Sequence, residues 1–361
     1  MVMSEYEKLQ LEKVREHRER ELSRSPRRFV PESVKDRGRR IYVKAVDTPG
    51  AAKVRDGGAA ALKSVAEGAG KIMTRTGQLT TSETRVIRAY ANKGHSVEHL
   101  DDIRQLDLHA IDKVASFKRL HYTYSASAAA EGAAAGFAVS GGQAIATVGA
   151  VAGAGAAAAP GLGTIAAAMG VDAAAVLTLC SRVTAHDALY YGYDPLDPAE
   201  EVFMMQVIGL GLAVTPSAKA IAYQQLAILT RSLATNMAWR ELNQQLLVKV
   251  AQKFAGQFTQ KLTKKKLGQF VPFAGIGIGA VLNWKMIDDV ADAAFWAYRE
   301  RFLYEKGGAI PPIVIDGEPE HAVPGDDGET SIDVVGILES EGIAIIDEET
   351  QLDQIRDAGH G

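Results

Sequence analysis

One stretch of the chain, residues 132–171, constrains the fold more than any other. Its forty residues contain no Asp, Glu, Lys or Arg, although 23% of the whole sequence is charged. A helix of this composition has no polar face to turn towards water, so it must pack against another apolar surface. Pro160-Gly161 interrupts the run, which predicts two apolar helical arms joined by a break, a helical hairpin.

Small residues recur in this hairpin at helical spacing. Gly132, Gly136 and Ser140 occupy every fourth position, which lets two helix backbones approach closely. A second charge-free run, residues 267–284, has Gly275 and Gly279 at the same spacing. The first arm is long enough to cross a hydrocarbon core of about 20 residues, but it has few strongly apolar side chains. Both a hairpin buried in a helical core and one that contacts a membrane fit this pattern.

The remaining composition indicates an all-α protein. Alanine is abundant and aromatic residues make up 7% of the chain, which is typical of helices rather than sheet sandwiches. Apolar residues at every fourth place, such as Val250 and Phe254, predict further long helices. We predict a multi-helix bundle over residues 46–306 around the central hairpin, in which Asp172 opens a helix and Lys285 opens the last one.

Charge is unevenly distributed around this domain. Residues 1–45 carry thirteen Lys and Arg against eight acids, and residues 307–361 carry one Arg against fourteen acids. Both segments are predicted to be polar tails, and the helix expected over residues 4–24 has so little to bury that we expect a solvated arm. Within the acidic tail, residues 332–346 are apolar enough to form a short packed element.

The sequence indicates a cytoplasmic protein at the inner face of the membrane. The N-terminus has no apolar core of a signal peptide, and the single cysteine, Cys180, excludes a disulfide framework. Lysines follow one another just before the second apolar run, which suits an anionic membrane surface: Lys261, Lys264, Lys265 and Lys266. We expect peripheral or partly inserted association with lipid or membrane-protein helices, with a second copy of the chain as another candidate partner.

Polar side chains are rare in the apolar helices and should pair, because an unpaired buried charge is costly. The expected buried network comprises Glu131, Asp172, Arg182, His186 and Asp187. Asp172 and Arg182 are ten residues apart, about 15 Å along a helix, too far for a direct bridge. We expect Arg182 to pair with Glu131 or with an acid of the last helix, namely Asp288, Asp289 or Asp292. The cluster is either a structural network or a polar functional site.

A turn motif follows, made of Tyr191, Gly192, Tyr193 and Asp194. Gly192 is placed to end one helix in a C-terminal cap. Asp197-Pro198 is placed to begin the next, with Glu200 completing a capping box.

One pattern resembles a metal site. His95, Glu98 and His99 have the spacing of an inverted zinc-protease motif, which needs both imidazoles on one helical face. Gly94 and a capping Ser96 would instead place His95 outside the next helix. The metal interpretation therefore remains an alternative, and the sequence supplies no motif for a cofactor, a phosphate loop or nucleic-acid binding.

The ordered motifs together resemble the EcsC family of bacterial proteins. The resemblance covers roughly residues 46–306 and is carried by the following residues: Glu131-Gly132 and Gly136 within residues 127–136, Asp172, Tyr191-Gly192-Tyr193-Asp194, Asp197-Pro198, Glu201, Val271-Pro272-Phe273-Ala274-Gly275, Gly279 and Asn283. It implies a mostly helical domain, named for its neighbourhood with an ABC transporter linked to secretion and membrane peptide processing, with no established activity. We therefore expect a membrane-associated accessory or scaffold protein, with a hydrolase, metal-dependent or built on the polar cluster, as the alternative.

Overall fold

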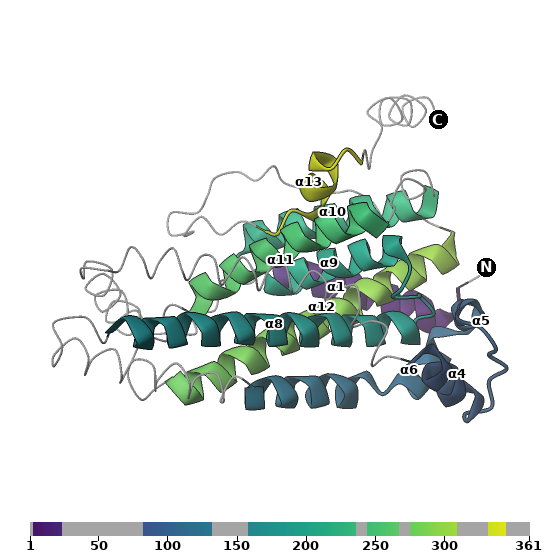
Figure 1. The fold of residues 1–361 in the computed structure, drawn as a ribbon. Helices are drawn as coiled ribbons and strands as arrows, with labels where there is room; N and C mark the ends of the chain where they lie inside the picture. Colours follow the sequence, from purple (N-terminus) through teal and green to yellow (C-terminus); the bar gives the residue numbers. More distant parts are fainter. Residues whose placement is uncertain are drawn as a thin grey trace.

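The computed structural model describes residues 3–23, 82–131, 158–235, 244–266, 275–308 and 331–343. Within these ranges the regular elements are helices, and no strand occurs. The helices pack lengthwise against one another in a bundle (Figure 1). The prediction of an all-α multi-helix bundle is confirmed.

Long helices form the body of the bundle: α8 (Ala158–Tyr190), α9 (Pro198–Leu212), α10 (Pro216–Thr235), α11 (Gln244–Lys266) and α12 (Gly275–Gly307). The central helix is α9, which contacts the other four. Nearly all of its side chains are buried, including Phe203 and Ile208. A helix that is apolar on all sides is stable only inside such a shell.

Close backbone approach at a small residue occurs between α9 and α12. A Cβ atom on Gly211 would lie 2.6 Å from the Cα atom of Val290, so only glycine allows the two helices to lie this close. Sequence reasoning had placed such crossings at other glycines. Gly132, Gly136 and Ser140 lie outside the described residues, and Gly275 and Gly279 fall in the first turns of α12, whose side chains are not described.

Helix α8 corrects one predicted boundary. It is continuous from Ala158, so Asp172 lies in its interior and does not open a new helix. Pro160 occupies the first turn, where the missing N–H has no helical partner to lose. Pro160 and Gly161 therefore lie inside α8, near its start, and residues 132–157 of the predicted first arm lie outside the described residues.

The last long helix also begins earlier than predicted. α12 starts at Gly275 rather than Lys285, so part of the glycine-containing run 267–284 is helical. Each interior glycine costs about 1 kcal/mol relative to alanine, which lowers helix propensity without forbidding the helix. None of the described helices is both long and apolar enough to span a bilayer.

Short helices gather where α8 and α12 end: α4 (Glu83–Ala91), α5 (Leu100–Gln105) and α6 (Leu108–Ala115) (Figure 1). Residues 117–131 form a further helical segment. It packs beside α8 and α12, since Phe117 contacts Phe295 and His121 contacts Asp187. The end of the bundle with α4 to α6 is called the closed end below.

Both flanking segments contribute a helix that packs on the bundle. α1 (Glu5–Ser23) lies against α6, α10 and α12 and buries Glu7, Gln10 and Val14, so the expectation of a solvated arm is wrong for these residues. The buried groups are mostly polar, and periodicity of apolar residues could not reveal them. α13 (Val334–Ser340) packs on α9, α10 and α11, which confirms the short packed element predicted in the acidic tail.

Candidate functional site

Three consecutive charged residues near the end of α12, Arg299, Glu300 and Arg301, are buried. Successive helix positions are rotated by about 100°, so the three side chains leave α12 in different directions. Each meets a partner from another part of the chain. This arrangement was not predicted from the sequence.

Arg301 is held by two carboxylates and two rings. Its guanidinium donates to Glu200 of α9 at 2.7 Å and to Glu305 at 2.8 Å. The same group lies 4.0 Å from the centre of the Tyr193 ring and 4.8 Å from that of Phe203. Buried ion pairs of this kind need several hydrogen bonds to offset the loss of hydration.

Arg299 joins α12 to α6 and α1. Its two terminal nitrogens bind both oxygens of Asp112, at 2.8 and 2.6 Å, in the planar fork that suits a carboxylate. It also donates to Gln10 of α1 at 3.0 Å and to the Tyr191 hydroxyl at 3.2 Å. Glu300 accepts from Arg18 of α1 at 2.9 Å. These contacts hold α1 against the bundle.

The turn motif adopts the predicted caps. Gly192 has a φ of +84°, and the Tyr193 N–H donates to the Ala188 carbonyl at 2.9 Å, so the C-terminal cap of α8 is confirmed. Asp197 caps α9 through the Ala199 N–H, as predicted, with Pro198 in the first turn. The proposed capping box is wrong, because the Glu200 carboxylate points inward to Arg301 and to the Tyr298 hydroxyl.

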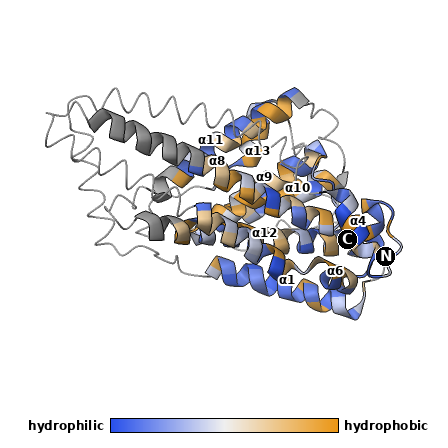
Figure 2. Ribbon diagram, turned by 60° about the horizontal axis from the view of Figure 1, so that its bottom comes forward, coloured by the Kyte–Doolittle hydropathy of each residue, from blue (hydrophilic) through white to orange (hydrophobic). Residues whose placement is uncertain are grey.

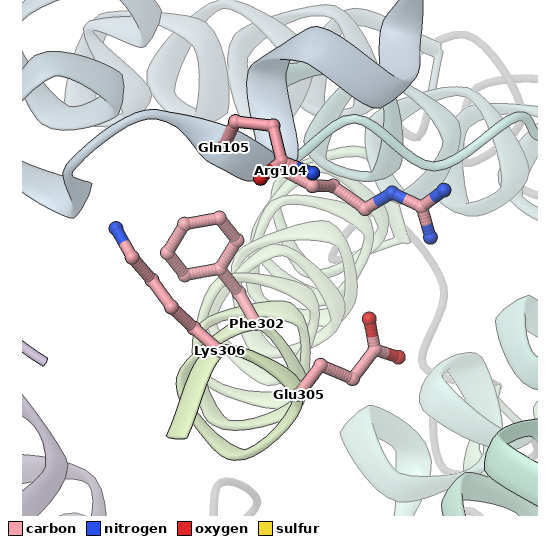
Figure 3. A pocket seen from close by; sticks show the side chains of 5 residues that line it. All are labelled: Arg104, Gln105, Phe302, Glu305 and Lys306. Atoms are coloured by element: carbon pink, nitrogen blue, oxygen red, sulfur yellow. The ribbon is translucent and has the colours of Figure 1, made fainter. Parts of the chain in front are cut away.

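A cavity of about 210 Å³ lies at the closed end, between α5 and the last turns of α12. It is lined by Arg104, Gln105, Phe302, Glu305 and Lys306, with the Phe302 ring between the lysine and the glutamate (Figure 3). Lys306 binds Glu7 at 2.5 Å, Glu305 accepts from Tyr193, and Arg104 pairs with Asp101. Each charged group that lines the cavity therefore already has a partner in the chain.

The predicted polar network on α8 resolves into separate pairs. Asp172 accepts from Asn283 of α12 at 2.8 Å. Asp187 lies with both oxygens 3.0 Å from Nε2 of His121. His186 receives the Tyr124 hydroxyl at Nδ1, at 2.6 Å. The side chains of Asp172, His186 and Asp187 of the predicted network therefore each contact a neighbouring helix and do not contact one another.

Burial and mutual attraction shift the pKa values of Asp187 and His121. Burial raises the pKa of Asp187, while His121 opposes that shift. For His121, burial acts to lower the pKa, but Asp187 and Asp292 outweigh it, and the pKa is raised above its ordinary value. Both groups are charged only at a pH above the raised pKa of Asp187 and below the raised pKa of His121.

Arg182 does not form the predicted ion pair. Among the described residues no carboxylate lies within 4.0 Å of its guanidinium, and its Nε atom is buried without a hydrogen bond. Asp289 pairs instead with Lys285, and Asp292 with His17 and Trp296. Glu131 lies at the surface, where partial desolvation and the nearby Asp172 raise its pKa, while Arg182 acts from a distance to lower it.

The comparisons with known proteins match residues 42–303 to the EcsC protein family. The chain belongs to the EcsC family. It is also 27% identical over 244 residues to the uncharacterised protein YdbA of Bacillus subtilis (strain 168), covering 66% of this chain and 75% of YdbA. No solved structure matches it significantly. Two residues of the EcsC resemblance, Asp172 and Asn283, are the pair that joins α8 to α12.

The metal-like pattern of this EcsC protein does not form a ligand set. His99 is the N-cap of α5, in a capping box with Asp102, so the predicted cap at Ser96 is wrong. His95 and Glu98 lie in the preceding loop, so the two imidazoles do not share a helical face. In the described part of the chain, no group of three His, Cys, Asp or Glu is placed to hold a metal ion.

The predicted membrane-surface lysines fall in the last turns of α11. Lys261 is half-buried. The side chains of Lys264, Lys265 and Lys266 lie outside those that the structure describes. Their role as a lipid-facing cluster stays a prediction from the sequence.

Acid should destabilise this EcsC protein through His186. Burial, with Arg85 adding to it, lowers the pKa of His186 from 6.5 to about 4. Between these values the unfolded chain binds a proton that the folded one does not, so the free energy of unfolding falls as the pH falls, by roughly 3 kcal/mol in all. Urea unfolding from pH 7 to pH 4 should show a smaller decline for His186→Gln than for the wild type. Parallel pH profiles would contradict this assignment.

Proposed function

We propose that this EcsC protein is a helical accessory or scaffold protein that associates with the cytoplasmic face of the cell membrane, in a role linked to membrane transport or secretion. One observation carries the proposal. Helices α8 and α12 contain the last parts of the two charge-free runs, 132–171 and 267–284, and both begin at the same end of the bundle (Figure 1). This end, opposite the closed end, is called the open end.

The two ends differ in chemistry. The closed end contains the ion pairs of Arg299 and Arg301 and the polar cavity. At the open end, α8 and α12 begin within the two charge-free runs, residues 132–171 and 267–284. A sequence without charges over this length is stable as a helix only against lipid or another apolar helix, which supports membrane contact at the open end.

The outer face of the bundle supports the same orientation. Figure 2 shows α1 as a predominantly hydrophilic helix. Its exposed positions carry both signs of charge, as in Lys8, Glu12 and Lys13, which suits solvent rather than lipid. Attachment through the open end leaves this face in water.

Polar chemistry in the described bundle favours a scaffold over an enzyme. The buried carboxylates Glu200, Glu300 and Asp187 are each engaged by a cation or an imidazole. Cys180 is buried, and burial raises the pKa of its thiol, which disfavours the nucleophilic thiolate. These groups connect helices and leave no described constellation poised for covalent chemistry.

Cell fractionation and vesicle sedimentation test the proposal. The full-length protein should sediment with vesicles that contain phosphatidylglycerol, and less as salt rises. Each lysine near an anionic surface contributes about 1 kcal/mol, so changing Lys264, Lys265 and Lys266 to Gln should weaken binding roughly 100-fold.

The matched control changes three exposed cations of α1, namely Lys8, Lys13 and Arg20, to Gln and should bind like the wild type. A protein that stays in the supernatant with these vesicles at low salt would overturn the proposal. If both triple variants lost the same vesicle affinity, binding would depend only on the net charge of the protein. That result would contradict membrane contact at the open end.

A further inference from the structure

A patch of exposed apolar side chains lies between α12 and the helical segment 117–131. Tyr122 is 65% exposed and Val281 is 57% exposed. The Tyr122 and Trp284 rings meet edge to face, with centroids 5.3 Å apart and planes at 77°. Val281 and Trp284 are three residues apart on α12 and therefore share a face. The contact holds two aromatic rings together at the surface of the bundle.

These side chains have the chemistry of a membrane interface. Tyrosine and tryptophan combine an apolar ring with a polar hydroxyl or N–H, and they concentrate where headgroups meet acyl chains. Cations lie nearby: Lys118 and Arg119 are exposed on the same helical segment, about one turn before Tyr122. They complement the negative charge of an anionic headgroup layer.

The acids around the patch do not cancel this charge. Asp288 is exposed on α12 one turn beyond Trp284. Asp289 is already paired with Lys285. Lys118, Arg119 and Lys285 together outnumber these two acids, so the surroundings of the rings are weakly basic.

The size of the patch separates a bilayer from a protein partner. An aromatic side chain buries about 150–250 Å², so the three residues supply less than the roughly 800 Å² per partner of a standard protein interface. A bilayer needs no such matched area, because each side chain inserts individually. The patch is also continuous with the first half of α12, whose chain begins at the open end.

We propose that Tyr122, Val281 and Trp284 form an interfacial anchor that enters the headgroup region of an anionic bilayer, with Lys118 and Arg119 at its edge. This inference rests on the proposed membrane function and specifies which described surface meets the lipid. The aromatic pair fixes the rotation of the bundle about its long axis, which an apolar end alone would leave free.

Sedimentation with phosphatidylglycerol vesicles tests the anchor in the full-length protein. The double variant Tyr122→Ser with Trp284→Ser should bind at least about tenfold more weakly, because the inserted ring area is lost. The control, Leu9→Ser with Leu196→Ser, removes apolar side chains of 48% and 46% exposure away from the patch and should change binding less than about twofold.

Fluorescence provides a second measurement that does not depend on truncating the rings. Vesicles with brominated acyl chains should quench the wild-type tryptophan emission, and Trp284→Phe should remove that quenched component while still binding. Failure of the wild type to bind any vesicle would overturn the proposed function and the anchor together. Normal binding by the double variant, or unchanged quenching in Trp284→Phe, would overturn the anchor alone. Shielding of Trp284 by self-association without vesicles would also overturn it.

Discussion

Replacing Arg301 by methionine is expected to lower the free energy of unfolding by about 3 to 5 kcal/mol. Methionine keeps much of the side-chain volume but removes the charge that Glu200 and Glu305 share. Glu200 is almost completely buried, so its carboxylate would lose its main partner where water cannot replace it. The loss of the cation over the Tyr193 ring adds to the effect.

Urea denaturation followed by circular dichroism measures this change. Arg104→Met is the matched control, since Arg104 is partly exposed and its ion pair with Asp101 lies on the surface. The control should lose less than about 1 kcal/mol. If both variants lost a similar free energy of unfolding, the buried ion pairs of Arg301 would contribute no more to stability than the surface ion pair of Arg104.

Replacing Gly192 by alanine is expected to destabilise the protein by about 2 to 5 kcal/mol. The left-handed conformation costs a residue with a Cβ atom roughly 1–2 kcal/mol, and overpacking costs about 1–3 kcal/mol more. Gly192 has a φ of +84°, and an added Cβ would lie 2.6 Å from the Leu100 carbonyl oxygen. Thermal unfolding monitored by circular dichroism measures the loss.

Gly94 provides the control for this variant. It has the same φ of +84°, but nothing lies within 4 Å of the position of its Cβ atom. Gly94→Ala should therefore show the conformational cost alone, about 1–2 kcal/mol. If both alanines cost the same, the tight contact between the turn and α5 does not contribute to stability.

The helical fold was predictable because its signals are local. Apolar spacing located α11 through Val250 and Phe254, both fully buried. The caps at Gly192 and Asp197 depend on backbone chemistry within a few residues, and they were found correctly. The helix starts predicted at Asp172 and Lys285 were wrong. Each residue is the first charged one after a charge-free run, but the helix continues through it.

The polar contacts were harder to predict because they join residues far apart in the chain. Arg299 lies 187 residues from Asp112 and 289 residues from Gln10. No spacing rule links such positions, and Gln10 sits in a helix that resembles a solvated arm. Glu200 had a local explanation as part of a capping box, and only the packing of α12 showed the stronger partner. The sequence offered one signal for these contacts. Charged residues on an otherwise apolar helix, without an opposite charge one turn away, must find partners elsewhere in the chain.

The packing of α1 also determines which recombinant fragment of this protein contains the complete core. The family match covers residues 42–303, whereas Gln10, Glu7 and the lysine that binds Glu7, Lys306, lie beyond those limits. A recombinant fragment with the family boundaries would leave Arg299 without one of its acceptors and would uncover the face of α9 that lies under Ile332. Proteins trimmed in this way would report the solubility and stability of an incomplete core, so the folding unit to express is the longer one that includes α1 and α13.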